Sequence, residues 1–361
     1  MRTVKVSLDE RSYPIRIGEC LLKELGPQCA QLKLGQRCSL ITDETVAGKY
    51  QQPVMASLRA AGFQPTVIKL KSGERTKKLQ NVHACYERFA THRLERNSFV
   101  VALGGGVVGD LAGFAAATYL RGTHFVQVPT TLLAQVDSSV GGKVGVNLAA
   151  GKNLVGAFHQ PRLVLCDLDT LRTLPPREFR AGLAEIIKYG IIYDARLFNR
   201  LERDLPLLLK QDASTLAAII ARCCQIKAKV VSQDEKESGL RAILNFGHTV
   251  GHALEAISRY GKYLHGEAIS IGQVVAAMIS REQTGLPAKD ADRIVALLER
   301  AGLPVSVKLS ATQTRRLLEA IRLDKKVSGG ETKFVLAKRI GRVITGQAVP
   351  SQVLRQALNQ K

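Results

Sequence analysis

The chain has 361 residues and an excess of basic side chains, with 52 Lys and Arg against 31 Asp and Glu and a formal net charge of +21. Hydrophobic residues make up 45% of the sequence, which is enough for a packed core and excludes a disordered or collagen-like chain. Because one hydrophobic core usually stops growing below this length, we expect two domains.

The N-terminus is polar and lacks the apolar run of a signal peptide. The longest weakly polar runs, such as residues 111–120, fall short of the roughly 20 residues that a membrane span needs. The seven cysteines are odd in number, scattered and without a CxxC pair, which indicates reduced thiols rather than disulfides or a thiolate zinc site. We therefore predict a cytoplasmic protein with no membrane partner.

The basic excess is concentrated at the C-terminal end, where residues 306–361 contain twelve Lys or Arg against three acids. Apolar residues alternate with these charges in amphipathic order, which favours a folded segment over a polar tail. Aromatic residues make up only 5% of the chain, which is low for a surface that stacks bases. A nucleic-acid-binding protein is the alternative of a different class, but we expect small anionic ligands and no nucleic acid.

The first half of the chain alternates short strand-like runs with helical stretches. Residues 4–8 and 13–17 are typical of a hairpin. Five further runs are candidate parallel strands, at 38–42, 66–70, 99–103, 124–128 and 163–165. This order predicts a Rossmann-like α/β domain with a mostly parallel sheet over residues 1–174.

From residue 175 onward the pattern changes to helical spacing. Only residues 333–336 have a clear strand pattern in this half. The predicted helices are 178–191, 214–231, 248–260, 268–283 and 288–301. We therefore expect a mainly α-helical second domain over residues 175–361.

A glycine-rich turn follows the predicted strand 99–103. Gly104, Gly106 and Gly109 fit the pattern GxGxxG, and a strand, turn and helix in this order can cradle a phosphate at the helix N-terminus. The turn lies mid-chain and lacks the acid that usually follows about 20 residues later to hold a ribose. Asp43 is another acid that could do so. A tight turn with glycines for packing is the alternative.

A second group of side chains has the composition of a metal site. His248 and His252 stand four residues apart on a predicted helix, a spacing that suits zinc. His265 lies in a predicted turn downstream. Glu185 and Lys188 are charged residues within an apolar helix, where a buried charge is costly unless it is paired or binds a metal. A metal site with two histidines and one glutamate, open to substrate oxygens, would explain these charges. Spacing alone does not decide which two histidines bind the metal.

Charged and amide side chains also stand among glycines in residues 135–143 and 151–153. Glycines let the backbone approach a ligand closely, and lysines there favour phosphate or carboxylate. Singly, each such residue is more commonly a solvated surface charge. The remaining candidates of this kind are Arg121, Lys227, Arg241, Asn245, Lys325 and Lys326.

Together these motifs resemble the 3-dehydroquinate synthase family. The likeness runs from the first strand to residues 324–326, with several long motifs in one order. The motifs are GGGVVGD (104–110), VPTTLLAQVDSSVGGK (128–143), GKN (151–153), GLAEIIK (182–188) and NFGHTVGH (245–252). Other sugar-phosphate cyclases and metal-dependent polyol dehydrogenases of the same fold are the near alternatives. The dense set of candidate anion-binding residues argues against a neutral polyol.

The resemblance implies an NAD-dependent and zinc- or cobalt-dependent lyase of the shikimate pathway. Its substrate would be DAHP (3-deoxy-D-arabino-heptulosonate 7-phosphate), and its products 3-dehydroquinate and phosphate. In that family a hydroxyl is transiently oxidised by NAD, phosphate is eliminated, the ketone is reduced again and an intramolecular aldol step closes the ring. The resemblance also implies a homodimer.

Carried over position by position, the resemblance implies three sets of site residues. The metal ligands are Glu185, His248 and His265, so His252 faces the substrate. NAD contacts fall on Asp43, Ser72, Gly73, Glu74, Arg75, Thr76, Lys77, Gly106, Val107, Val108, Gly109, Asp110, Thr130, Thr131, Lys143, Lys152, Thr170, Leu171, Arg172 and Thr173. Substrate contacts fall on Arg121, Asp137, Lys143, Asn153, Lys188, Lys227, Arg241, Asn245, His252 and one of Lys325 and Lys326. Two acids compete for the Asp43 position, because Glu44 follows directly.

Overall fold

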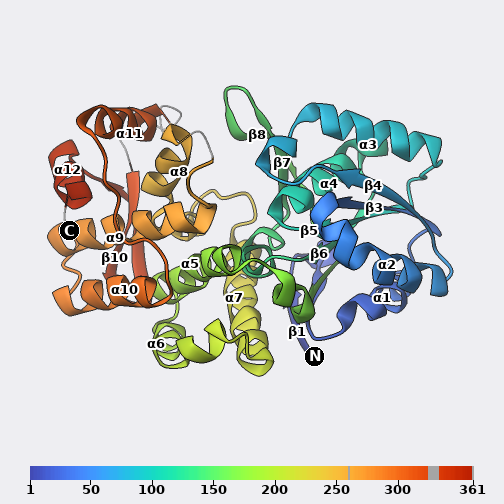
Figure 1. Ribbon diagram of the computed structural model, residues 1–361, viewed down its shortest axis with the longest axis horizontal. Helices are drawn as coiled ribbons and strands as arrows, with labels where there is room; N and C mark the ends of the chain where they lie inside the picture. The colour runs from blue at the N-terminus through green and yellow to red at the C-terminus, as the bar shows by residue number, and fades with distance from the viewer. Residues whose placement is uncertain (259–260, 324–332, 360–361) are drawn as a thin grey trace. The chain divides into compact units, whose positions relative to one another are not determined.

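The computed structural model describes residues 1–258, 261–323 and 333–359 and separates into two compact units (Figure 1). The first unit contains Met1–Leu174 and Ala213–Lys236, and the second contains Pro175–Asp212 and Glu237–Lys361. The division therefore differs from the predicted one in a single segment. Helix α7 (Ala213–Gln233) joins the first unit because it packs against the first two strands of the sheet.

A seven-stranded sheet forms the centre of the first unit, in the order β1-β2-β9-β6-β5-β3-β4. The first two strands are the predicted antiparallel hairpin, and every other neighbouring pair is parallel. The mostly parallel α/β fold is thus confirmed. The strands are β1 (Arg2–Val6), β2 (Tyr13–Gly18), β3 (Arg37–Asp43), β4 (Gln64–Leu70), β5 (Phe99–Gly104), β6 (His124–Pro129) and β9 (Leu163–Asp167).

Both faces of this sheet are buried, as β5 shows. Side chains alternate along a strand, so Phe99 and Val101 enter one hydrophobic cluster while Val100 and Ala102 enter the other. A strand covered on both sides reads as a continuous apolar run, which is why its sequence is so clear. The helices lie on the two faces as α1 (Leu25–Gln31) and α2 (Glu44–Ala60) on one, and α3 (Leu79–Thr91) and α4 (Gly106–Thr118) on the other (Figure 1).

A second, two-stranded sheet in the first unit was not predicted. It pairs β7 (Lys143–Leu148) with β8 (Gly151–Phe158) in antiparallel fashion. Two glycines face each other where these strands approach: a Cβ on Gly145 would lie 2.6 Å from the carbonyl oxygen of Val155. Glycine has low strand propensity, so the sequence resembles a loop although the backbone is a hairpin.

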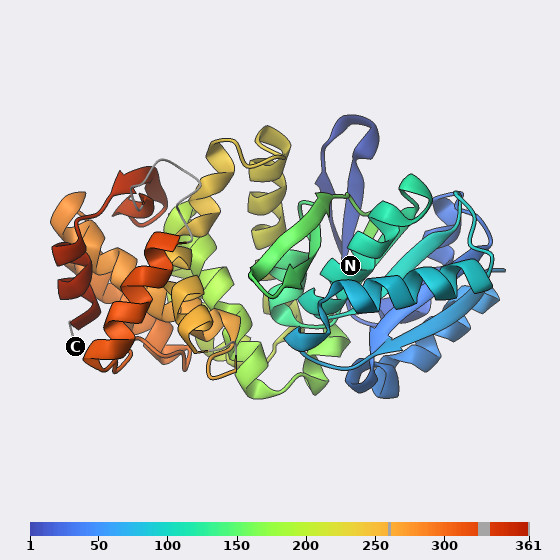
Figure 2. The same ribbon diagram turned by 90° about the horizontal axis from the view of Figure 1, so that it is seen from above.

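The second unit is mainly helical, which confirms the predicted class. Helix α9 (His265–Gln283) is central and contacts α5, α8, α10, α12 and strand β10 (Figure 1). Figure 2 shows the helices of this unit from above. The described part of the basic C-terminal segment is folded, since Phe334 and Leu336 are buried in the hydrophobic core of this unit. The other elements are α5 (Pro176–Ile192), α6 (Ala195–Leu209), α8 (His248–Ile257), α10 (Ala288–Arg300), α11 (Ala311–Leu323), β10 (Lys333–Arg339), β11 (Arg342–Ala348) and α12 (Ser351–Asn359).

Helix α9 begins earlier than its apolar spacing predicts. Residues 265–267 form its first turn rather than a loop. The side chain of Glu267 accepts a hydrogen bond from the backbone N–H of Leu264 at 2.9 Å, which satisfies one amide at the helix start. Within the described residues, no helix is both long and apolar enough to cross a membrane.

Candidate active site

The glycine-rich turn joins β5 to α4 at the carboxyl edge of the large sheet. Its glycines are closely packed: a Cβ on Gly109 would lie 2.8 Å from Oε1 of Gln127 and one on Gly106 would lie 3.0 Å from Oγ of Ser138, so these side chains would have to shift. The turn also begins a helix whose first amides lack intrahelical partners. Both interpretations of the motif are therefore compatible with the structure, because close packing and an anion-binding helix N-terminus coexist.

Five predicted residues gather beside this turn, and we call them with Asn147 the Lys77 cluster (Glu74, Lys77, Asp110, Asn147, Lys152 and Asn153). The ammonium of Lys77 is buried and contacts Oδ2 of Asp110 and Oδ1 of Asn153. Burial raises the pKa of Asp110, against the effect of Lys77. A buried ammonium is stable only when polar groups compensate its charge, and Asp110 and Asn153 do so for Lys77. These contacts also fix the position of the Lys77 side chain.

Asn147 is the member of this cluster that the sequence did not single out. Its Nδ2 donates to Oε1 of Glu74 at 2.7 Å, and its Oδ1 accepts from the backbone N–H of Asn153 at 2.9 Å. Its own backbone N–H donates to the carbonyl oxygen of Lys77 at 2.8 Å. Asn147 therefore joins the 74–77 turn to the β7–β8 hairpin. A single Asn in a glycine-rich stretch carries no sequence signal for this role.

Two other predicted segments lie at the carboxyl ends of strands in the same sheet. Asp43 ends β3 and caps α2, accepting hydrogen bonds from the N–H groups of Thr45 and Val46 and from Oγ of Ser72. Residues 170–173 follow β9, where the hydroxyls of Thr173 and Tyr50 lie 2.5 Å apart. The carboxylate of Asp43 is thus positioned by the fold, whereas Glu44 is exposed.

Helix α7 contributes a buried lysine to the first unit. Nζ of Lys227 lies 2.7 Å from the carbonyl oxygen of Asp137 and 2.9 Å from its Oδ1. Only 7% of the Lys227 side chain is exposed. The predicted residues Lys227 and Asp137 are therefore in contact, because α7 packs within the first unit.

Arg121 is not brought to the Lys77 cluster. It is exposed beyond the C-terminal end of α4, with a left-handed φ of 67°. The glycine turn is at the other end of that 13-residue helix, roughly 20 Å away at 1.5 Å per residue. Lys143 is also exposed, at the start of β7.

In the second unit, three of the predicted residues converge on one point. Oε1 of Glu185 lies 3.4 Å from Nε2 of His248 and 3.5 Å from Nε2 of His265. Potential ligand atoms of the three residues all lie within 4.8 Å of one another. Glu185 is 1% exposed, and its other oxygen contacts the ammonium of Lys188. We call Glu185, Lys188, His248, His265 and the neighbouring Glu255 the Glu185 cluster.

Charge and burial compete in this cluster. Burial favours a higher pKa for Glu185, but the ammonium of Lys188 and the two imidazoles hold it well below its ordinary value. Burial and Lys188 lower the pKa of His248. Partial burial also acts to lower the pKa of His265, but hydrogen bonds with Glu185 and Glu255 raise it to about 9. The cluster is thus a buried carboxylate surrounded by nitrogen donors.

Two glycines of α9 allow these side chains to meet. A Cβ on Gly266 would lie 1.9 Å from the carbonyl oxygen of Ala181 on α5, four residues before Glu185. A Cβ on Gly272 would lie 2.0 Å from the carbonyl oxygen of Gly247, which precedes His248. Only glycine permits such backbone approach. The helices that carry the three residues are therefore in backbone contact.

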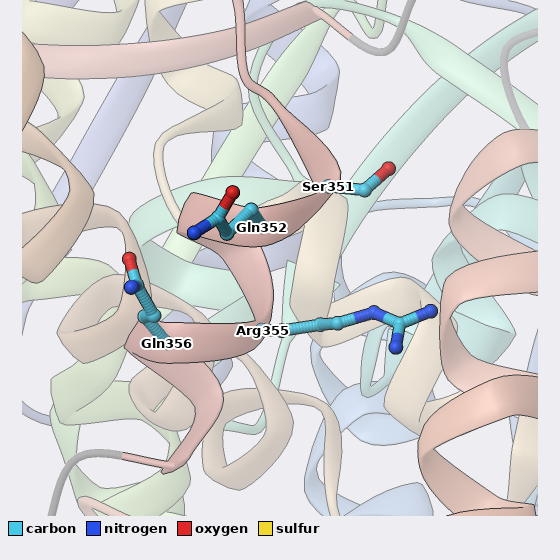
Figure 3. A pocket seen from close by; sticks show the side chains of 4 residues that line it. All are labelled: Ser351, Gln352, Arg355 and Gln356. Carbon is cyan, nitrogen blue, oxygen red and sulfur yellow. The ribbon is translucent and has the colours of Figure 1, made fainter.

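The remaining predicted residues of the second unit lie in several environments. His252 is exposed on α8, its ring centroid 5.2 Å from that of His248. Arg241 is buried, and Asn245 donates from Nδ2 to Oε1 of Glu237 at 2.9 Å. Lys325 and Lys326 lie outside the described residues. A pocket on α12 is lined by none of the predicted residues; it is formed by Ser351, Gln352, Arg355 and Gln356 (Figure 3).

Comparison with known proteins gives the family. The profile of the 3-dehydroquinate synthase N-terminal family matches residues 67–181, and that of the 3-dehydroquinate synthase C-terminal family matches residues 182–327. The chain belongs to the 3-dehydroquinate synthase family. A 3-dehydroquinate synthase from Nostoc punctiforme is 49% identical over 357 residues, which is 98% of each chain.

Solved structures place the family's fold among sugar-phosphate cyclases. A 2-epi-5-epi-valiolone synthase from Streptomyces hygroscopicus, with NAD+ and Zn2+ bound, superposes with a TM-score of 0.89 at 27% identity over 99% of this chain and 98% of that one. A 2-deoxy-scyllo-inosose synthase complexed with carbaglucose-6-phosphate, NAD+ and Co2+ has a TM-score of 0.87 at 27% identity over 99% of both. An iron-containing alcohol dehydrogenase from Thermotoga maritima shares the fold at 16% identity.

Proposed function

We propose that this protein is a 3-dehydroquinate synthase, a phosphorus–oxygen lyase that converts DAHP to 3-dehydroquinate and phosphate. The observation that carries the proposal is sequence identity. The chain is 49% and 51% identical to two proteins named 3-dehydroquinate synthase over nearly its full length, but only 27% identical to the two cyclases with other products. The Glu185 and Lys77 clusters contain the residue types that this chemistry needs. We further propose that the protein is cytoplasmic and, as the family resemblance implies, that it forms a homodimer.

We propose that the first unit holds NAD. The carboxyl edge of its parallel sheet offers the N-terminus of α4 for a pyrophosphate and the fixed carboxylate of Asp43 for a ribose. Glu74, Lys77 and Lys152 would complete the dinucleotide contacts. The two cyclases of similar fold were crystallised with NAD+, which supports this assignment.

We propose that Glu185, His248 and His265 hold one divalent metal, Zn2+ or Co2+. One carboxylate and two imidazoles within 4.8 Å form a donor set suited to either ion. Lys188 contacts one oxygen of the buried Glu185 carboxylate, and the other oxygen faces the two ring nitrogens, where a cation would be stabilised by all three residues. When bound, NAD supplies a hydride acceptor, and the metal polarises the hydroxyl that is oxidised.

The polar side chains of the chain would bind and orient the anionic substrate. We propose that Lys188, buried beside Glu185, donates to a substrate oxygen, and that Lys227, Arg241 and Asn245 bind its charged groups. The imidazole of His252 is exposed and is not one of the three proposed metal ligands, and we propose that it relays a proton.

Phosphate release from DAHP tests the proposed reaction. Purified protein with catalytic NAD and Zn2+ or Co2+ is expected to release one phosphate per DAHP with no net accumulation of NADH, because the hydride returns to the product. Glucose 6-phosphate, which lacks the carboxylate, should release none. Absence of release from DAHP under these conditions contradicts the assignment, and steady NADH formation from a polyol would favour the dehydrogenase alternative.

Lys152 provides a test of the first unit. Its Nζ lies 3.9 Å from Oε1 of Glu74 and its side chain is one-quarter exposed. Lys152→Ala should weaken binding of NAD or DAHP by roughly tenfold, the loss of one charge-assisted hydrogen bond to an anion. Steady-state kinetics with each ligand varied would measure this, with exposed Lys49→Ala as the control. Unchanged kinetic constants for both NAD and DAHP would show that Lys152 does not contact either ligand.

A further inference from the structure

The two histidines of the Glu185 cluster have the same arrangement around their rings. Each directs Nε2 toward Oε1 of Glu185, at 3.4 Å for His248 and 3.5 Å for His265. Each places Nδ1 near an oxygen: the backbone carbonyl of Phe246 at 3.2 Å, and Oε2 of Glu255 at 3.1 Å. One nitrogen of each ring thus faces the convergence point, and the other faces an acceptor.

We propose that Glu255 is a positioning residue that fixes the tautomer and orientation of His265 for metal binding. This inference rests on the metal site proposed above. Histidines that bind metals usually donate their second ring N–H to a carboxylate or a carbonyl, which sets the tautomer and makes the ligand nitrogen more basic. With its proton on Nδ1 and donated to Glu255, His265 presents the lone pair of Nε2 toward Glu185.

The location of Glu255 suits this role. It is only 4% exposed, on α8 and seven residues after His248, so two turns of one helix supply both a proposed ligand and the acceptor for another. His265 is on α9, and α8 and α9 are in direct contact. Glu255 therefore also sets the His265 ring relative to the helix that carries His248.

The competing arrangement makes Glu255 a ligand itself. Potential ligand atoms of His252, Glu255 and His265 also lie within 4.8 Å of one another. An ion shared by Glu255 and His265 would take Nδ1, the ring nitrogen that lies 3.1 Å from Oε2 of Glu255, and that nitrogen could then no longer donate to Glu255. His252 is exposed and Glu185 is absent from this group, so the buried charge of Glu185 would stay without a metal. We therefore favour the positioning role.

Metal affinity and the His265 tautomer distinguish the two arrangements. Zn2+ affinity would be measured by competition with a chromophoric chelator for wild type, Glu255→Gln and Glu255→Met. Gln keeps an oxygen acceptor, whereas Met fills the space without one. We expect a loss of 10- to 100-fold for Met and of less than about tenfold for Gln. In Zn2+-loaded wild type and Gln variant, the nitrogen NMR shifts of His265 should report a protonated Nδ1.

Each other outcome overturns the positioning role. Equal losses for Gln and Met together with an unprotonated Nδ1 of His265 would make Glu255 a ligand. Equal affinity in all three proteins would leave Glu255 without influence on the metal. Exposed Glu282→Ala on α9 is the control for removal of one negative charge, and far-ultraviolet circular dichroism of the metal-free variants checks their fold. Failure of wild type to bind Zn2+ would instead refute the metal site itself.

Discussion

His248→Ala is expected to lose phosphate release from DAHP by roughly 10³-fold, because several kcal/mol of charge stabilisation depend on the metal. Removing its imidazole takes one of three converging donor atoms and leaves Glu185 and His265 to hold an ion alone. The metal-free fold should change little. His248 lies in the first turn of α8, whose packing residues Val250 and Leu254 remain.

Three measurements on one preparation check this expectation: the rate of phosphate release, the bound metal after dialysis, and the thermal midpoint of the metal-free protein. His83→Ala is the matched control, because His83 on α3 of the first unit has a 75% exposed side chain and does not belong to the Glu185 cluster. Full metal content together with full activity in His248→Ala would refute the ligand assignment. A large drop in the thermal midpoint would instead indicate a structural role.

Gly266→Ala is expected to destabilise the second unit by about 3 kcal/mol or more, at the upper end of what overpacking costs. The added Cβ would lie 1.9 Å from the carbonyl oxygen of Ala181, so the backbones of α9 and α5 must separate. Since α9 begins at His265 and α5 carries Glu185, this separation should also weaken metal binding. The effect on stability does not depend on the proposed activity.

Denaturant unfolding of the metal-free protein measures the loss of stability, and chelator competition measures the loss of metal affinity. Gly48→Ala is the control, since Gly48 is exposed in α2 with no atom within 4 Å of an added Cβ. That variant should gain stability by up to about 1 kcal/mol, as alanine does over glycine in a helix. An unchanged unfolding midpoint for Gly266→Ala would show that α9 and α5 are not held at backbone contact.

Much of the fold could be predicted because the relevant signals are local. Buried parallel strands such as β3 and β5 read as short apolar runs, and α5 and α10 have clear helical spacing. The structure differs from these predictions where backbone packing or a side-chain hydrogen bond, rather than apolar spacing, decides the local structure. The β7–β8 hairpin was missed because close backbone approach requires glycines that have low strand propensity. The start of α9 was placed too late because the Glu267 side chain, not apolar spacing, satisfies its first turn.

The sequence by itself determined the family and which residues are candidates for its site. Residue types in a fixed order along the chain were enough to indicate a phosphate-binding turn, a His and Glu metal site and the family that combines them. These features can be recognised from the sequence because each motif is a short, contiguous stretch of the chain. Glu185 stands out in the sequence for the same reason, as a charge among apolar neighbours on one helix.

Only the tertiary structure decided which side chains meet. It placed α7, and with it Lys227, in the first unit, and it joined Asn147 to Glu74 and Glu255 to His265. It also left Arg121 at the far end of α4 from the glycine turn. These outcomes depend on how elements distant in sequence pack, through contacts such as that between Gly266 and Ala181, and no local pattern encodes such contacts.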